Sequence, residues 1–465
     1  MAGTAETGAE TQTDARLLIP GRRPLTIGLV LVITAIAFEA LAVSTALPVV
    51  SRELHGVRLY GWAFSSFMLA NLVGITLGGP LSDRIGPARP ALVGLVLFGG
   101  GLVVSGVAPT MLLVVVGRFV SGLGAGAVIS TAYVVMGLGY PEAARARLFA
   151  VISSAWVLPS LIGPVLAGTL AEHVGWRSVF LVLAPVMVLD AMLILPAMRG
   201  IRPPEHDEDR RPLPVLDATR LAGGAGLLVA GLGSRSLPLG VGLVVLGLVL
   251  AVNPFRRLVP EGTLRARGVL PTAVALRGLL AFSFFTFDGF LPLTLTSLRG
   301  QSPTRAGLAL TAGGVSWAAG SWVQERKGGR WGRRRTASTG AGLIIGGIVV
   351  AGSVLDPAVP VAVAPLGWCI AGLGMGICYP TTGLVVLDES PVNRVGASSS
   401  ALQLADVLGV ALGTGAAGAA LAFALAAGWG RRRGIEIIDA MTLAVAGLAL
   451  FTARRLPGRA HSHTP

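Results

Sequence analysis

The chain has 465 residues, of which 53% are hydrophobic and only 13% are charged. A soluble protein carries about 25% charged residues to cover its surface, so the composition argues against a soluble enzyme, and the high hydrophobicity excludes intrinsic disorder. The formal net charge is +14, yet Lys327 is the only lysine. A phosphate-binding loop needs a lysine after its glycines. The sequence QERKGGR around Lys327 is no such loop, so ATP-driven transport by this chain is not expected.

Apolar segments of the length that a membrane span requires, about 20 residues, recur along the whole chain. Strong spans are expected at residues 25–49, 60–80, 91–109, 111–137, 148–171 and 178–198, and again at 269–298, 305–323, 337–355, 360–387, 396–426 and 436–453. Two weaker segments, 217–233 and 237–254, would either cross the bilayer as a hairpin or lie at its surface. We therefore predict an all-α membrane protein.

The charged, proline-rich stretch RGIRPPEHDEDRRPLP divides the apolar segments into two groups. The first 24 residues lack the short apolar core and small-residue cleavage site of a secretory signal, so no cleaved signal peptide is expected. The predicted organisation is a cytoplasmic N-terminal tail (1–24), an N-terminal six-helix bundle (25–199), a polar linker (200–216), an inserted hydrophobic hairpin (217–254), a C-terminal six-helix bundle (269–453) and a cytoplasmic tail (454–465).

Basic residues gather in alternate loops, which lie on one side of the predicted membrane. With the N-terminus inside, that side holds most of the 37 basic residues, including the run Arg330, Arg333, Arg334 and Arg335. Because basic loops stay in the cytoplasm, the protein is predicted to lie in the inner cell membrane with both termini inside. This bias explains the positive charge without nucleic acid. The triplet Arg431–Arg433 falls on the outer side and does not fit the pattern.

Two adjacent spans recur in the same order in the second half of the chain. VSGLGAGAVISTAYVV, beginning at Val120, resembles IAGLGMGICYPTTGLVV, beginning at Ile370, with its glycines offset by 250 residues. SSAWVLPSLIGPVLAG, at Ser153, resembles SSALQLADVLGVALGT, at Ser399, with an offset of 246. Parallel repeats are a known plan for transporters, in which substrate binds at mid-membrane between the two halves. The alternative is chance similarity between helices rich in Gly and Ala.

The loop after the second span, GGPLSDRIGP, resembles a motif of the major facilitator superfamily, G-x-L-x-D-R-x-G-R-R/K. The matching residues are Gly79, Leu81, Asp83, Arg84 and Gly86, whereas Pro87 and Ala88 replace the two basic positions. The resemblance implies a conformational switch, in which Asp83 faces a helix N-terminus of the other half and holds one end of a transporter shut. The alternative role of Asp83 is to cap a turn. A degenerate copy, GSWVQERKGGRWGRR from Gly320, occupies the matching loop of the second half.

Three further segments resemble the same superfamily. SLIGPVLAG in the fifth span is similar to the G-x-x-x-G-P-x-x-G-G motif of its drug:proton antiporter branch through Gly163, Pro164 and Gly168. FEALAVSTALP in the first span is similar to L-D-x-T-I-V-N-V-A-L-P of the fourteen-span antiporters, with Glu39 in place of the family's Asp. GRFVSGLGAGA resembles the fourth-span motif, in which an arginine, here Arg118, precedes spaced glycines that let another helix approach.

Charged residues inside the spans are the best markers of function, because such a charge is costly unless it is paired or faces a cavity. The resemblance supports Glu39 and Arg118 as proton-coupling residues, and Asp288 and Asp406 are further candidates for proton coupling or substrate binding. Asp190 and Arg277 are interpreted as residues near span ends that extend toward the headgroups. An aromatic substrate pocket is expected from Trp156, Trp317, Phe284, Phe287 and Met136, unless these side chains serve packing alone.

Together these features predict a proton-coupled secondary transporter that exports amphipathic or cationic small molecules, such as drugs, by alternating access. We expect a monomer whose partners are the substrate, protons and membrane lipid, with no cofactor or metal beyond the proton gradient. The alternatives are an exporter of a specific metabolite or natural product with the same fold, and a receptor or sensor that transports nothing. An intramembrane enzyme is not expected, because the sequence has no HExxH or GxSxG motif.

Overall fold

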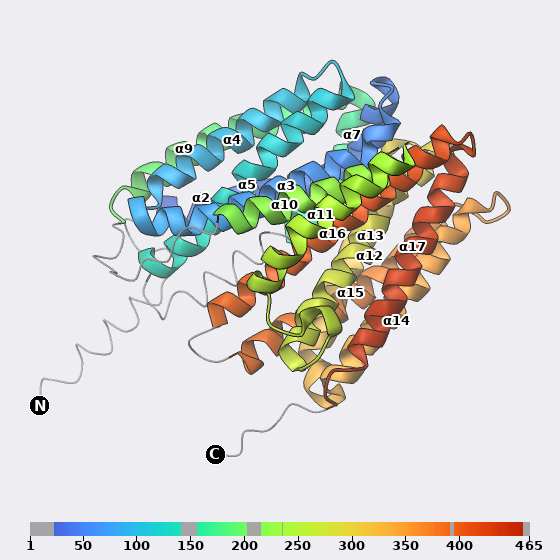
Figure 1. Ribbon diagram of the computed structural model, residues 1–465. Coiled ribbons are helices and arrows are strands. Elements are labelled where there is room, and N and C mark those ends of the chain that lie inside the picture. The colour runs from blue at the N-terminus through green and yellow to red at the C-terminus, as the bar shows by residue number, and fades with distance from the viewer. Residues whose placement is uncertain are drawn as a thin grey trace, which may run out of the picture.

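The computed structural model describes residues 23–140, 155, 157–201, 215–234, 236–390 and 395–458. Over these ranges the chain folds into long α-helices with short 3₁₀ and π turns, and it contains no strand (Figure 1). The all-α fold class predicted from the sequence is therefore confirmed.

The N-terminal half is a six-helix bundle in which the sixth membrane segment is divided in two. Its first five helices are α2 (Arg23–Glu53), α3 (Tyr60–Ile85), α4 (Ala88–Gly106), α5 (Met111–Gly139) and α7 (Val157–Leu170). A π-helical turn, Ala171–Gly175, then leads to the divided segment, α8 (Arg177–Leu181) and α9 (Leu183–Met198).

The C-terminal half repeats this plan with six continuous helices. They are α12 (Val269–Ser297), α13 (Pro303–Trp331), α14 (Arg333–Gly352), α15 (Val363–Glu389), α16 (Val395–Ala426) and α17 (Gly430–Ala453). Between the halves lie α10 (Val215–Leu232) and α11 (Leu237–Leu258), the hairpin that the sequence placed at 217–254. Over the described ranges, the helices therefore group into two bundles, with α10 and α11 between them in the chain.

The hairpin helices pack against each other through glycines. A Cβ at Gly224 would lie 2.7 Å from the Gly247 carbonyl oxygen, and one at Gly231 would lie 2.8 Å from that of Gly240. Residue numbers increase along α10 from Gly224 to Gly231, while those of the facing glycines in α11 decrease from Gly247 to Gly240. The two helices therefore run antiparallel. α10 lies beside α3 and α16, one helix from each bundle, and α11 packs against α10 (Figure 1). That the hairpin crosses the bilayer stays a prediction.

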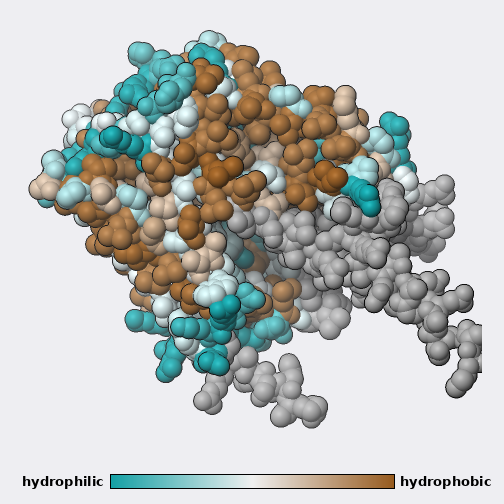
Figure 2. Space-filling view, turned by 180° about the vertical axis from the view of Figure 1, so that it is seen from behind, coloured by the Kyte–Doolittle hydropathy of each residue, from teal (hydrophilic) through white to brown (hydrophobic). Residues whose placement is uncertain are grey.

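Twelve of the described helical segments, with α8 and α9 counted together, are long and apolar enough to cross a membrane. This set includes both hairpin helices, which the sequence ranked as the weaker segments. It leaves out α7, of which 14 residues are described, and α13, whose last turns carry the charged run QERKGGRW. Apolar side chains form a broad surface band between hydrophilic patches at opposite edges of the molecule (Figure 2). Such a band is expected where lipid replaces water around a bundle.

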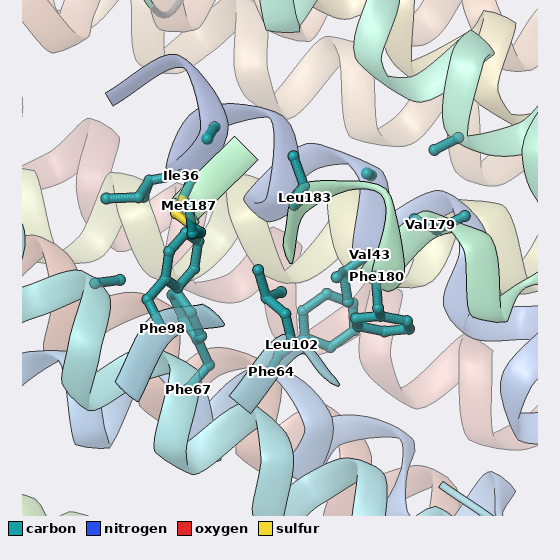
Figure 3. Close-up of a cluster of buried hydrophobic side chains, with 14 of the residues drawn as sticks. Ile36, Val43, Phe64, Phe67, Phe98, Leu102, Val179, Phe180, Leu183 and Met187 are labelled. Carbon is teal, nitrogen blue, oxygen red and sulfur yellow. The ribbon is translucent and has the colours of Figure 1, made fainter. Parts of the chain in front are cut away.

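The core of the N-terminal half lies where α2, α3, α4 and the divided segment α8–α9 meet. Figure 3 shows Phe98 and Leu102 of α4 among Ile36 and Val43 of α2, Phe64 and Phe67 of α3, and Val179, Phe180, Leu183 and Met187 of α8 and α9. Leu102 and Phe98 are fully buried. This packing fixes the position of α2, the helix that contains the first candidate site residue, Glu39.

The repeat detected in the sequence has the same packing in both halves. A Cβ at Gly124 would lie 2.5 Å from the Gly94 carbonyl oxygen of α4, and one at Gly374 would lie 2.5 Å from the Gly340 carbonyl oxygen of α14. On the neighbouring helix face, Gly122 and Gly372 let α5 and α15 touch the backbones of α3 and α13. The expected close helix approach at these glycines is confirmed, and the two bundles are pseudo-symmetric.

The bundles meet closely at one end, which we call the closed end and which carries the turns at 54–59, 171–176 and 298–302. There Gly61 of α3 lies so near α16 that an added Cβ would be 2.5 Å from the Gly418 Cα. The Tyr60 hydroxyl donates a hydrogen bond of 2.9 Å to the Gly289 carbonyl oxygen. From this end the helices of the two halves diverge toward the lower left of Figure 1.

Candidate functional site

Glu39 and Arg118 form a buried ion pair inside the N-terminal half. Arg118 Nη1 contacts Glu39 Oε1, and the two side chains are 2% and 1% exposed. Arg118 Nε donates a hydrogen bond of 3.0 Å to the Ala63 carbonyl oxygen of α3, and its guanidinium lies 4.1 Å from the centre of the Phe67 ring. Gly122, one turn after Arg118, brings α5 against α3 and so makes these contacts possible. A buried charge is tolerated when it is paired in this way.

Asp288 has a different partner at the equivalent place in the C-terminal half. The Trp368 indole Nε1 donates a hydrogen bond of 3.1 Å to Asp288 Oδ1. Trp368 stands 250 residues after Arg118, the offset of the repeat that contains it. Both pairs therefore join the first and fourth helices of their bundle. Trp368 was not predicted from the sequence, although applying the repeat offset to Arg118 would have found it.

Trp368 belongs to an aromatic cluster within the C-terminal half. Its ring stacks on Phe284, with centroids 4.6 Å apart, and on Phe287, with centroids 5.2 Å apart. Trp317 meets Phe284 edge-on at 5.4 Å. Met136 instead packs in the core of the N-terminal half. The aromatic substrate pocket therefore stays a prediction, and Trp156 lies outside the described residues.

Asp406 on α16 is joined to α15 and α12. The Tyr379 hydroxyl donates a hydrogen bond of 2.8 Å to Asp406 Oδ1, and the Arg277 guanidinium lies 3.4 Å from the centre of the Tyr379 ring. Asp406 is therefore connected with a buried arginine through a shared tyrosine. Tyr379 was another residue that sequence reasoning missed. Its signal is a phenol in the middle of a membrane span.

Asp190 and Arg277 do not reach out from span ends, so that interpretation is wrong. Asp190 is fully buried in α9, and both its carboxylate oxygens lack a hydrogen-bond partner among the described residues. It lies against α2, where a Cβ at Gly28 would be 3.3 Å from Asp190 Oδ1. Arg277 is only 9% exposed. Helix packing encloses both residues at positions that span length alone placed near the surface.

The switch motif ends α3 in a backbone conformation that needs glycine. Gly86 has φ 81° and ψ 157°, and Gly332, between α13 and α14, has φ 75° and ψ 158°. This region is essentially reserved for glycine, which confirms that the loops match in the two halves. Arg84 lies in the last turn of α3, and Gly79 packs near Ser130 of α5. The Asp83 side chain lies outside the described residues, so its role in the switch stays a prediction.

The antiporter-like motif lies where the two halves touch. A Cβ at Gly168 of α7 would be 2.6 Å from the Pro303 carbonyl oxygen at the start of α13. One turn away, the Pro164 carbonyl oxygen lies against Gly307 of α13, whereas Gly163 faces Phe38 of its own half at 3.6 Å. Two of the three motif residues thus take part in the contact between the bundles.

The triplet Arg431–Arg433, which did not fit the charge pattern, is partly balanced by a neighbouring acid. Arg432 Nε lies 3.1 Å from Glu436 Oε1, and Arg433 Nη1 lies 2.8 Å from Glu436 Oε2. These are exposed pairs one helical turn apart, which contribute little stability. They lower the local net charge, but the positive-inside rule counts arginine and lysine alone, so the triplet still does not fit the pattern.

Comparison with known proteins agrees with this architecture. The sequence model described as Major Facilitator Superfamily matches residues 27–414. An uncharacterized MFS-type transporter of Mycobacterium tuberculosis is 28% identical over 90% of this chain, which spans 63% of that relative's length. A probable multidrug-efflux transporter of the same organism is 26% identical, over 88% of this chain and 91% of the relative.

Among solved structures, a bacterial homologue of the human lysosomal transporter Spinster has a similar fold. That structure, in an inward-facing and unoccupied conformation, superposes with a TM-score of 0.68 and 14% sequence identity. The match covers 94% of this chain and 97% of the Spinster homologue. At this identity the likeness concerns the fold alone.

Proposed function

The chain belongs to the Major Facilitator Superfamily, and from this premise we propose that it is a proton-coupled exporter of amphipathic or cationic small molecules. Like its named relatives, it is a transporter and not an enzyme. The name of the multidrug-efflux relative supports export of drug-like compounds. The proposal further places the protein in the inner cell membrane as a monomer, with both termini in the cytoplasm.

The Glu39–Arg118 ion pair is the observation that carries the proposal. Arg118 compensates the negative charge of Glu39, so the pair is stable when Glu39 has lost its proton. In the proposed orientation the closed end faces outward, and this conformation is the one that has delivered a proton to the cytoplasm. When the outer end opens, Glu39 takes up a proton from outside and releases Arg118. A cationic substrate competes with that proton, and the exchange is antiport.

The test is proton-driven flux in liposomes that contain purified protein. We expect the parent to accumulate a lipophilic cationic dye such as ethidium against its gradient when a pH gradient is imposed. Glu39→Gln should still bind the dye but lose the response to the gradient. Glu261→Gln, which changes an exposed glutamate in a loop, is the matched control and should transport normally. A Glu39→Gln protein that responds like the parent would remove Glu39 from the coupling step.

The same assay separates the alternatives. A chain that carries no dye but exchanges one metabolite would be a specific exporter of the same fold. A receptor would bind ligand and show no flux at any pH gradient.

The proposed orientation has its own test. Trp331→Cys, in a variant without Cys369 and Cys378, places one thiol beside the basic run Arg330–Arg335. In intact cells this thiol should resist a membrane-impermeant reagent and react after the membrane is opened. Ready labelling in intact cells would contradict the proposed orientation and place this loop outside the cell.

A further inference from the structure

Arg277 of α12 is a buried arginine with unused hydrogen-bond donors. Its side chain is 9% exposed, and its Nε and Nη1 atoms have no acceptor within the described part of the chain. A guanidinium carries five N–H groups and is always charged. Leaving the donors of a buried charged group without a partner is more costly than leaving a neutral group unpaired. In this conformation the Nε and Nη1 atoms of Arg277 are therefore available to an acceptor supplied by a ligand.

The neighbours of Arg277 hold it in position, in part through a side-chain hydrogen bond with Tyr379, and leave Nε and Nη1 without an acceptor. The Tyr379 ring supports the guanidinium from one face at 3.4 Å. Asp406, the acidic group of this cluster, already accepts the Tyr379 hydroxyl through Oδ1 at 2.8 Å. One turn before Asp406, the exposed Gln403 hydrogen-bonds with Tyr133 of the N-terminal half. The cluster therefore adjoins the boundary between the two halves, where a transporter of this plan binds its substrate.

Comparison of the halves shows that the fold does not need this cluster. The offsets that align Glu39 with Asp288, Arg118 with Trp368 and the fifth with the eleventh span pair Arg277 with Gly28, Tyr379 with Ile129, and Asp406 with Ser160. None of the three N-terminal counterparts is charged. The N-terminal bundle thus has the same helix packing without the arginine, the phenol or the carboxylate.

We infer that Arg277 binds a carboxylate group of the transported molecule, so that the substrates include zwitterionic amphipathic compounds. The inference rests on the proposed transport function and narrows its substrate class. A carboxylate supplies the acceptors that Nε and Nη1 lack, and arginine forms strong charge-assisted bonds with it. The cationic part of the substrate would lie toward the carboxylates Glu39 and Asp288. The aromatic part would suit the adjoining ring of Trp317, whose centroid is 5.3 Å from that of Tyr379.

Two dyes with one ring system test this inference. Rhodamine B carries a free carboxylate and is zwitterionic, whereas its ethyl ester is a cation of nearly the same size. Binding is measured by fluorescence polarisation on the purified full-length protein. We expect Arg277→Gln to weaken rhodamine B binding about 10- to 100-fold, the loss of one or two charge-assisted hydrogen bonds. Binding of the ester should change no more than about 2-fold.

Further variants separate a binding role from a structural one. Arg277→Lys, which keeps the charge, should restore part of the rhodamine B affinity. Asp406→Asn, which removes the competing negative charge, should strengthen binding of rhodamine B more than binding of the ester. Arg330→Gln changes an exposed arginine and should leave both affinities unchanged. Equal losses for both dyes in Arg277→Gln, or a parent that binds only the ester, would overturn the inference.

Failure of this inference is distinguishable from failure of the transport proposal. Suppose that a pH gradient drives transport of the ester, but Arg277→Gln weakens binding of both dyes equally. The transport proposal then stands and the carboxylate site does not. If neither dye moves with the gradient but Arg277→Gln selectively loses rhodamine B, the site stands without the transport.

Discussion

The two halves bury a carboxylate at the same place and treat its charge differently. In the N-terminal half, Arg118 supplies a positive charge to Glu39. In the C-terminal half, Trp368 at the position equivalent to Arg118 supplies one neutral N–H group to Asp288. An ion pair keeps a carboxylate ionised, whereas a single neutral donor leaves the balance between the charged and protonated forms to the surroundings. The contact between the first and fourth helices is thus common to both halves, whereas the charge of the group that faces the carboxylate differs.

The glycines around these residues explain how the change is accommodated. Phe67 of α3 lies against the Arg118 guanidinium. In the other half the indole of Trp368 lies against Gly313, where a Cβ would be 2.6 Å from its Nε1 atom. The larger ring therefore requires a residue without a side chain on the facing helix. The two halves therefore share their backbone packing, but each half has its own type of partner for the buried carboxylate.

The largest effect is expected from removing the cation of the N-terminal pair. Arg118→Leu leaves Glu39 buried without a partner and should lower the free energy of unfolding by about 3–5 kcal/mol. Combining it with Glu39→Gln should recover most of that loss. Thermal unfolding of the purified variants measures both. An additive double variant would contradict the pairing and with it the contrast between the halves.

A smaller and equal effect is expected at the shared glycines. Gly122→Ala and Gly372→Ala each push a methyl group into the backbone of the facing helix, and each should cost about 1–3 kcal/mol. Gly100→Ala and Gly342→Ala are matched controls, since nothing lies within 4 Å of either added Cβ. Unequal costs at positions 122 and 372 would show that the packing is less symmetric than the structure indicates.

The neutral pair of the C-terminal half should respond more weakly than the ion pair. Trp368→Phe keeps a ring beside Phe284 but removes the donor to Asp288, at a cost of about 1 kcal/mol. Trp317→Phe, in the same aromatic cluster, is the control. The measurement is thermal unfolding at pH 7 and pH 5. A loss as large as that of Arg118→Leu would mean that Asp288 is ionised and depends on Trp368 as Glu39 depends on Arg118.

The smallest effect concerns a contact between the halves at the closed end. The hydroxyl of Thr304 in the C-terminal half donates a hydrogen bond of 2.6 Å to Glu172 Oε2 of the N-terminal half. This bond holds the pKa of Glu172, which lies outside the membrane-spanning helices, below its usual value. Its contribution to closure is therefore present above the ordinary glutamate pKa of about 4.3 and is lost as the pH falls through the lowered value.

Spin labels on either side of the closed end should report this dependence as a distance that increases on acidification. Glu172→Gln should abolish the change. The nearby charged groups His173 and Arg305 are the controls, because their replacement should shift the response without removing it. A parent distance that is constant down to pH 3 would show that the contact does not bias closure.

Much of the fold follows from local properties of the sequence. The length and apolarity of the spans predicted the helices, and each predicted span overlaps a helix of the structure. The recurrence of Gly122 and Gly126 at 372 and 376 predicted the pseudo-symmetry and the close helix contacts. These succeed because a bilayer demands long apolar helices, and because a glycine at a helix contact is required by backbone geometry alone.

The partners of the charged residues were decided by tertiary structure. The sequence marked Glu39, Arg118, Asp288 and Asp406 as charges that need a reason, but it placed Asp190 and Arg277 wrongly and missed Trp368 and Tyr379. A charged residue inside a span can be recognised from the sequence alone, because its burial in the membrane is costly wherever it occurs. Whether an arginine, an indole, a phenol or nothing lies opposite depends on how helices far apart in the chain rotate and pack. Span length and composition carry no information about that rotation.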